Sequence, residues 1–260
     1  MRILAIANHK GGVAKTATVR ALGDVVAAAG VRVLMVDSDH QGSLSLSCSN
    51  YDANPCLANV YNVGGRALLP LAKVVRHVSA NLDMVPASLS LAAAETEIVS
   101  RPAREFILSE ALATVANTYD LVLIDCPPAL GQLVINALVA ADSVLIPTQP
   151  QPVDVAGVRM FLQTVDAIRS NPRLNPKLTL FGLLATFYDG RLKTHEGAVK
   201  AMTAAGWPVL PVRIPRSIRV AESAAVGQSV VTFEPGSVAA GAYQELGKQV
   251  LTWLKIKDKT

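Results

Sequence analysis

The chain has 260 residues, of which 51% are hydrophobic and 17% charged, so it is long enough to bury a sizeable core as one large α/β domain. Its formal net charge is +4, with 10 basic against 12 acidic residues in positions 1–150 and 14 against 8 in positions 151–260. The basic second half is either a solvated surface or a surface for an acidic partner. Three cysteines without C-x-x-C spacing argue against a disulfide framework, a zinc site and an iron–sulfur site.

Short apolar runs predict strands that are buried on both faces, as in a parallel sheet. In chain order, these runs cover residues 3–7, 31–36, 121–124, 143–147 and 178–186. Apolar residues at helical spacing predict a helix after the first strand, with Gly30 as its C-terminal cap, and further helices at 103–116, 153–169, 196–206 and 238–254. The alternation predicts a doubly wound α/β fold, with a mostly parallel sheet flanked by helices, in a single domain of residues 1–260.

Two features of the chain outside these elements carry further expectations. Residues 49–66 form its least regular stretch, and we expect them to be a surface excursion. No apolar run has the length of a signal sequence core or of a membrane span, so we expect a cytoplasmic protein.

The first predicted strand is followed by KGGVAKT, residues 10–16, and then by a helix, which is the layout of a phosphate loop. Backbone N–H groups at the helix N-terminus would face the phosphates, Lys15 would supply a point charge, and the Thr16 hydroxyl could ligate Mg²⁺. The usual pattern G-x-x-x-x-G-K-[ST] is not met, because His9 and Ala14 stand at its two glycine positions. If position 14 needs a glycine-like φ, alanine costs about 1 kcal/mol there. A glycine turn without function is the alternative.

Carboxylates follow two other predicted strands. Asp37 and Asp39 follow the run at 31–36, and Asp125 follows the run at 121–124 before two prolines. Ligands bind at the carboxyl ends of strands in such a sheet, and a magnesium–nucleotide site needs acids that hold the metal and orient the attacking water. Each acid alone is more often a residue that forms a turn at a strand end. Together with the glycine-rich loop, they predict a nucleotide site.

These segments resemble those of a known family. KGGVAKT, VDSDHQGS and LVLIDCPP are similar to the deviant Walker A, switch I and Walker B segments of the ParA/MinD ATPases. YDGRLK, VRIPRSIRVAESAAVGQSVVTFEP and GAYQEL resemble the C-terminal part of ParA-type partition ATPases, so the likeness extends nearly from end to end. The resemblance implies a P-loop NTPase fold of the deviant Walker A type, ATP and Mg²⁺ as cofactors, slow ATP hydrolysis, and an ATP-bound sandwich homodimer.

The resemblance also implies residue roles. Lys10, Lys15 and Asp39 would be catalytic: Lys10 would reach the nucleotide of the opposite subunit, Lys15 would serve the phosphates of its own, and Asp39 would position the hydrolytic water. Thr16 would be a direct Mg²⁺ ligand, Asp125 would act through a water molecule, and Asp37 would lie one step farther out. The nucleotide-binding residues would be Lys10, Gly11, Gly12, Val13, Ala14, Lys15, Thr16, Ala17, Ile214 and Pro215, the last two beside the adenine.

The family likeness further implies nonspecific binding of double-stranded DNA, with Arg191, Arg216 and Arg219 as candidate contacts, and stimulation of hydrolysis by a ParB-type partner. The work of such a protein is plasmid or chromosome partition in the cytoplasm, on the nucleoid. Within this family the chain resembles the Soj-like members, because its first strand is expected by residue 3. This leaves no room for an N-terminal helix-turn-helix, so we do not expect sequence-specific operator binding.

Some positions depart from the family pattern, and other functions stay open. Ala17 replaces a threonine that normally adds a hydroxyl near the α-phosphate, His40 replaces a proline, and Gln151 replaces a common acid. One alternative is a MinD-like membrane ATPase, because Leu246, Val250 and Leu254 share a helix face that is followed by lysines; we favour a core-packing helix and expect no membrane partner. Another alternative is a nucleotide-dependent scaffold that does not hydrolyse ATP.

Overall fold

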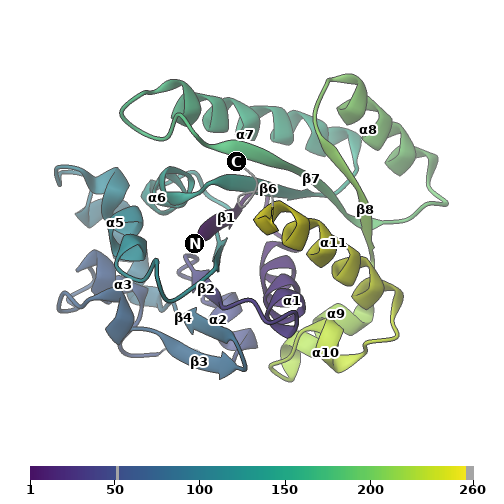
Figure 1. Cartoon of the computed structure of the whole chain (residues 1–260). Coiled ribbons are helices and arrows are strands. Elements are labelled where there is room, and N and C mark those ends of the chain that lie inside the picture. Colours follow the sequence, from purple (N-terminus) through teal and green to yellow (C-terminus); the bar gives the residue numbers. More distant parts are fainter. Residues whose placement is uncertain (51–52, 256–260) are drawn as a thin grey trace.

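A twisted eight-stranded sheet forms the centre of the molecule, with helices on both of its faces (Figure 1). The computed structural model of the chain describes residues 1–50 and 53–255. The strand order is β3-β4-β2-β5-β1-β6-β7-β8, and all neighbouring strands are parallel except β3 and β4. The prediction of a mostly parallel, doubly wound sheet is therefore confirmed.

The elements have the following bounds. The strands are β1 (Arg2–Ile6), β2 (Val33–Asp37), β3 (Arg76–Ser79), β4 (Leu82–Val85), β5 (Leu121–Asp125), β6 (Ser143–Thr148), β7 (Thr179–Tyr188) and β8 (Val209–Pro215). The longer helices are α1 (Lys15–Ala28), α5 (Ile107–Ala113), α6 (Gln132–Ala140), α7 (Pro152–Ser170), α8 (Lys193–Ala204), α9 (Ile218–Ala225) and α11 (Val238–Lys255). The short segments are α2 (Ser43–Ser47), α3 (Leu57–Tyr61), α4 (Ala94–Glu97), α10 (Val230–Phe233), η1 (Leu71–Lys73), η2 (Leu89–Ala93) and η3 (Arg104–Phe106).

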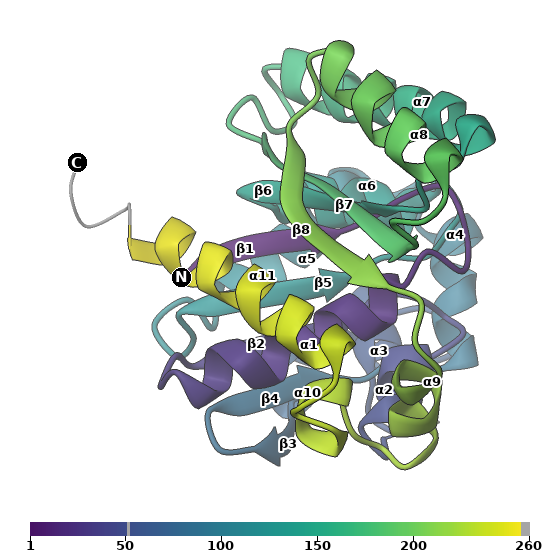
Figure 2. The same cartoon turned by 90° about the vertical axis from the view of Figure 1, so that its right-hand side faces the viewer.

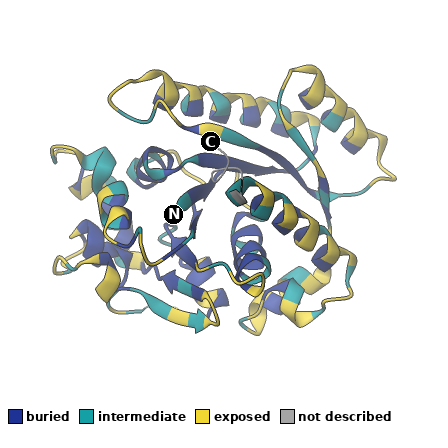
Figure 3. Ribbon diagram, in the orientation of Figure 1, coloured by how far each residue is buried: buried dark blue, intermediate teal, exposed yellow. Residues whose placement is uncertain are grey.

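The hydrophobic core consists of two layers, one on each face of the sheet. Successive side chains of a strand point to opposite faces, so Ala5 of β1 packs with α3, α5, α6 and α7, whereas Leu4 and Ile6 pack with α1, α10 and α11. The central strands are buried on both sides, and the inner faces of the helices are buried against them (Figure 3). This double burial explains why the strands are uninterrupted apolar runs in the sequence.

The topology brings the ends of three strands together. The chain continues from β1 to β2 on one side of the sheet, while β6 lies on the other side of β1, so the chain order reverses around β1. In register, Ile6 pairs with Asp125, and Asp125 pairs with Asp37. Ligands of doubly wound sheets bind at this kind of switch point.

Two parts of the fold differ from the sequence prediction. β3, β4 and β8 were not predicted; they lie toward the two ends of the sheet, and β3 has an alternating burial pattern instead of an apolar run. The expectation of a surface excursion at 49–66 was wrong for residues 57–61, because α3 is completely buried and its Leu57 and Tyr61 belong to the core. Other described residues of the stretch, such as Asn62 and Gly64, are exposed. Residues 51 and 52 of that stretch lie outside the described residues.

The C-terminal helix packs into the core, as predicted. Leu246 and Val250 of α11 are fully buried in the layer that also contains α1, and Leu254 packs against that layer. Residues 256–260, which include the last lysines of the sequence, lie outside the described residues. Among the described residues, none of the helices combines the length and the apolar character needed to cross a bilayer.

Candidate nucleotide site

The glycine loop, residues 8–14, joins β1 to α1 and contains two residues in the left-handed region of backbone conformation. Gly12 has a φ of 69°, and Ala14 has a φ of 65°. Glycine adopts this region freely, whereas the Cβ of alanine makes it unfavourable by about 1 kcal/mol. The structure therefore gives position 14 the glycine-like conformation that the phosphate-loop interpretation requires.

Ala14 is also the N-cap of α1, and no side chain caps this end of the helix. The first backbone N–H groups of a helix have no acceptor within the helix, and the helix dipole adds partial positive charge there. Residues 11–17 line a cavity of about 600 Å³. The uncapped helix end therefore offers hydrogen-bond donors to an anion such as a phosphate in this cavity.

The cavity extends from the glycine loop along α1 to α2, α9 and α10. These four helices gather on the same side of the sheet as α11 (Figure 2). The far wall is mostly apolar and includes Leu46 of α2, Val220 and Ala224 of α9, and Val230 of α10. The cavity thus suits a ligand with one anionic end and one less polar end.

Lys15 lies at the anion-binding end. Its side chain is buried, and Nζ donates hydrogen bonds to the carbonyl oxygens of Lys10 at 3.0 Å and Asn8 at 3.4 Å. Burial lowers the pKa of Lys15, and the nearby Asp125 carboxylate partly offsets this effect. A phosphate in the loop would favour the charged ammonium group further.

Thr16, Asp37 and Asp125 meet at the ends of β2 and β5. Thr16 Oγ1 donates a hydrogen bond to Asp125 Oδ2 at 2.7 Å, whereas Asp125 Oδ1 is buried without a hydrogen-bond partner. Asp37 Oδ2 accepts hydrogen bonds from the backbone N–H of Ser45 at 2.7 Å and from its hydroxyl at 2.6 Å. The sheet register brings Asp37 beside Asp125, and the hydrogen bond from Thr16 adds the third residue predicted to serve the metal.

The electrostatics of these acids suit a cation. Burial raises the pKa of Asp37 to about 6, and it raises the pKa of Asp125 well above its usual range, with the charge of Asp37 adding to the second shift. Mg²⁺ prefers oxygen ligands and is commonly held by one or two protein side chains together with substrate phosphates. In the part of the chain that the structure describes, no group of three or more His, Cys, Asp or Glu side chains is arranged to hold a metal alone. A magnesium ion here would therefore also need the oxygens of a ligand.

Asp39 lies two residues beyond the end of β2 and lines the cavity. Its side chain is only 14% exposed, and Oδ1 accepts a hydrogen bond from the backbone N–H of Gln41 at 3.0 Å. Asp39 therefore lies on the same cavity wall as Lys15 and Thr16, where its carboxylate could orient a water molecule.

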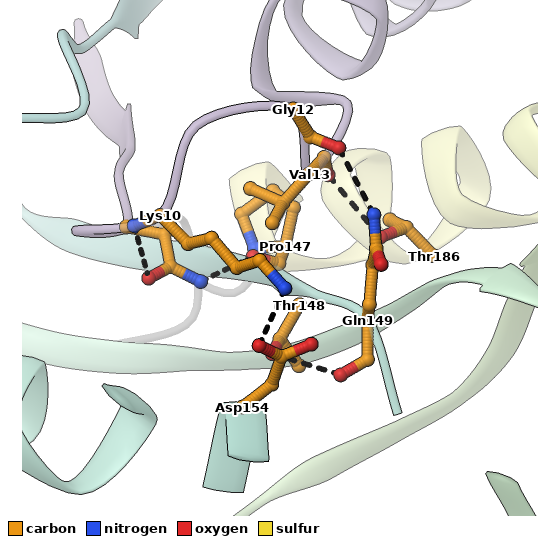
Figure 4. A network of polar contacts seen from close by, with 9 residues as sticks. Lys10, Gly12, Val13, Pro147, Thr148, Gln149, Asp154 and Thr186 are labelled. Atoms are coloured by element: carbon orange, nitrogen blue, oxygen red, sulfur yellow. Dashed lines mark hydrogen bonds and ion pairs between the residues drawn. The ribbon is translucent and has the colours of Figure 1, made fainter. Parts of the chain in front are cut away.

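Lys10 makes an ion pair within its own chain. Its Nζ lies 2.6 Å from Asp154 Oδ1 in the first turn of α7 (Figure 4). The Lys10 side chain is 42% exposed, whereas the Asp154 side chain is only 6% exposed and its Oδ2 has no hydrogen-bond partner. The lysine is therefore accessible from solvent, but it is held by a buried acid.

The glycine loop is also attached to the neighbouring strands. Gln149 Nε2 donates to the carbonyl oxygen of Gly12 at 3.1 Å, and Thr186 Oγ1 donates to that of Val13 at 3.2 Å (Figure 4). Gln149 follows β6 and Thr186 lies on β7. These hydrogen bonds attach the loop backbone to β7 and to the segment that follows β6.

The other predicted residues lie farther from the loop. Ile214 is buried in the core on β8, and Pro215 ends that strand, while Phe187 and Ser217 line the nearby part of the cavity. Contact of Ile214 and Pro215 with an adenine therefore stays a prediction. The three candidate DNA contacts, Arg191, Arg216 and Arg219, are exposed and follow or lie beyond the ends of β7 and β8.

Sequence reasoning missed three residues of the site. Asp154 gave no signal because its partner Lys10 is 144 residues away. Phe187 has a φ of 50° and lines the cavity, but no motif indicates this strained position at the end of β7. Arg20 is a buried cation on the cavity wall, and a charged residue one turn beyond Lys15 and Thr16 was an available clue.

The fold and this site together define a P-loop nucleotide-binding protein, and comparisons identify its family. The sequence profile of the AAA domain family matches residues 1–180. The sporulation initiation inhibitor protein Soj of Bacillus subtilis is 38% identical, with 96% of this chain and 98% of Soj covered. The chromosome partitioning protein ParA of Caulobacter vibrioides is 36% identical, with 97% and 94% covered.

Solved structures agree with this result. A Mycobacterium smegmatis protein titled cobyrinic acid a,c-diamide synthase, solved with ADP and magnesium, has a TM-score of 0.83 and 33% identity, with 98% of this chain and 96% of that chain covered. The cell division ATPase MinD of Pyrococcus furiosus shares the fold, with a TM-score of 0.78 at 22% identity and with 97% and 99% covered. The chain belongs to the family of ParA-type ATPases.

Proposed function

We propose that this protein is a Mg²⁺-dependent ATPase that partitions plasmid or chromosomal DNA. The observation that carries the proposal is the uncapped N-terminus of α1, which lies in one cavity with Lys15, Thr16 and Asp39. Family membership supports ATP as the nucleotide, and the relatives named Soj and ParA support DNA partition as the role. We expect the protein to act in the cytoplasm, on the nucleoid.

Each residue of the site has a role in this proposal. Lys15 and the first N–H groups of α1 bind the phosphates. Thr16 and Asp125 would hold a magnesium ion, which would supply positive charge beside the phosphates. Asp37 orients this end of the site through its hydrogen bonds to Ser45. Asp39 orients the attacking water. Its replacement should therefore stop ATP hydrolysis without weakening ATP binding.

Lys10 links nucleotide binding to assembly. In the proposed ATP-bound sandwich dimer, Lys10 leaves Asp154 and contacts the phosphates bound by the second subunit. The exposure of Lys10 supports this role, because a side chain that is 42% exposed can be reached by a second molecule. A ParB-type partner would then stimulate hydrolysis and release the dimer from DNA.

The candidate DNA surface consists of Arg191, Arg216 and Arg219. Tyr188 at the end of β7 pairs with Pro215 at the end of β8, so the segments that carry these arginines start side by side. Arg191 is paired with Asp189, and Arg219 is paired with Glu222 and Glu234. Exposed pairs of this kind are weak, so a phosphate backbone can replace the acids.

Two alternatives are less well supported. A membrane-binding, MinD-like role would need an available apolar face on α11, but Leu246 and Val250 are fully buried in the core. A scaffold that does not hydrolyse ATP would not need Asp39 on the cavity wall.

The 33% identity to a protein titled cobyrinic acid a,c-diamide synthase makes ATP-dependent amide formation a second candidate activity.

Nucleotide binding and phosphate release test the proposal together. Lys15→Ala should lose ATP binding, whereas Asp39→Ala should bind ATP and Mg²⁺ normally but release no phosphate. Duplex DNA and a ParB-type partner should stimulate phosphate release by the wild type with no acid substrate present. Unchanged ATP affinity in Lys15→Ala would contradict the site assignment, and phosphate release that requires an acid acceptor would favour amide formation.

A further inference from the structure

Arg20 is a buried cation on the wall of the nucleotide cavity. Its side chain is only 9% exposed, yet it lines the same cavity as the glycine loop. Within residues 1–50 and 53–255, three charged residues line this cavity: Lys15 and Asp39 belong to the proposed phosphate and water positions, and Arg20 is the third. A charged side chain is rarely buried without a partner, so each of its donors should have an acceptor.

Some N–H donors of the Arg20 guanidinium group have a hydrogen-bond acceptor, and others have none. Nη1 donates to Asp24 Oδ1 one turn along α1, and Asp24 Oδ2 accepts a hydrogen bond from Thr232 Oγ1 of α10 at 3.1 Å. This chain of hydrogen bonds fixes the orientation of the arginine. Nε of Arg20 is buried and has no hydrogen-bond partner. Because Nε is enclosed by protein atoms, a ligand cannot reach it. Nη2 makes no hydrogen bond to the described residues and is not fully buried, so it is the donor that a ligand oxygen in the cavity can reach.

Arg20 lies next to a part of the cavity wall where α1 offers no other polar side chain. Residues three apart lie on the same face of a helix, so Ala17 and Arg20 are neighbours on α1, and both line the cavity. The side chain of Ala17 has no hydrogen-bonding group, although this residue lies directly after Lys15 and Thr16 at the phosphate end. Beyond it the wall is mostly apolar, which leaves Arg20 as the nearest cationic donor along α1.

We propose that Arg20 binds the nucleotide at the junction between its phosphate chain and its nucleoside, and so supplies the polar contact that Ala17 lacks. The acceptor is an oxygen of the α-phosphate or of the ribose, which ATP and ADP share. This inference rests on the proposed nucleotide site. It adds a specificity contact on α1 that is separate from Lys15.

The test compares variants that keep the Asp24 environment constant. Asp24→Asn removes the charge of the partner, and Arg20→Met combined with Asp24→Asn also removes the guanidinium without leaving a buried acid. Thermal unfolding without nucleotide should show cooperative transitions for both variants, which establishes that they fold. Calorimetry should then give ATP and ADP dissociation constants about tenfold higher in the double variant than in Asp24→Asn, the size expected when one hydrogen bond to a charged group is removed.

Ala17→Thr provides a second readout, because its hydroxyl restores the missing donor. It should recover several-fold affinity in the double variant and change the wild type by less than about twofold. Equal dissociation constants in Asp24→Asn and the double variant would overturn the inference, as would a loss of affinity that affects ATP but spares ADP. Absence of nucleotide binding by the wild type would instead contradict the proposed function itself.

Discussion

Ala14 adopts a backbone conformation that favours glycine, so its substitution has a predictable sign. Ala14→Gly should raise the free energy of unfolding by up to about 1 kcal/mol, because relief of the left-handed strain exceeds the entropy that glycine adds to the unfolded chain. Urea unfolding without nucleotide measures the change. Ala21→Gly in the middle of α1 is the control and should be destabilising by at least about 1 kcal/mol. A destabilised Ala14→Gly protein would contradict the conformation assigned to the loop.

Asp37 should make the stability of the nucleotide-free protein depend on pH. Its pKa is raised to about 6 in the folded state by burial, so between about pH 4 and pH 6 the folded chain binds a proton that the unfolded chain has lost. The free energy of unfolding contributed by this group therefore falls as pH rises through that window, by about 1.4 kcal/mol for each unit of pKa shift. Asp37→Asn should flatten this fall, and urea unfolding at several pH values measures it.

Asp166→Asn is the matched control for that experiment, since the Asp166 side chain is 63% exposed on α7. It should leave the pH dependence as in the wild type. Identical curves for the wild type and Asp37→Asn would contradict the burial of an acid at this strand end.

At the scale of elements, α7 holds Lys10 through Asp154, and this ion pair competes with the proposed contact in the second subunit. When Lys10 leaves, a carboxylate that is only 6% exposed loses its partner, which is unfavourable. Asp154→Asn removes this penalty, so the ATP-bound dimer should form at several-fold lower protein concentration. Asp154→Glu keeps the charge and should behave closer to the wild type in sedimentation equilibrium. A weaker dimer in Asp154→Asn would show that the acid supports assembly.

The sequence predicted the central elements because their burial is regular. Strands buried on both faces appear as apolar runs, and α7, α8 and α11 have long helical patterns. β3 and β8 carry mixed patterns near the edges of the sheet, and α3 has only five residues, so local periodicity could not reveal them. The site residues next to strand ends were predictable for the same reason, whereas the pairing of Lys10 with Asp154 depends on the relative positions of β1 and α7.

At the scale of the whole molecule, the exposed arginines beyond β7 and β8 should bind DNA without reading its sequence. Arg219→Ala should weaken binding about equally for unrelated duplexes and reduce the log–log salt slope by roughly one for each phosphate group that the variant no longer neutralises. Arg169→Ala is the control, since Arg169 is also exposed and paired with an acid but lies near the end of α7. Weaker binding to one DNA sequence alone, or an equally weakened control, would contradict the proposed surface.

We propose that ATP binding, through Lys10 and Lys15, converts this chain into a dimer that binds DNA. Sedimentation velocity with ATP or ADP, with and without a nonspecific duplex, tests it most directly when Lys10→Ala is run beside the wild type. The expected result is a dimer that cosediments with DNA only for the wild type with ATP, and monomers for the wild type with ADP and for Lys10→Ala with either nucleotide. A wild type that stays monomeric with ATP, or a Lys10→Ala variant that dimerises normally, would contradict the claim.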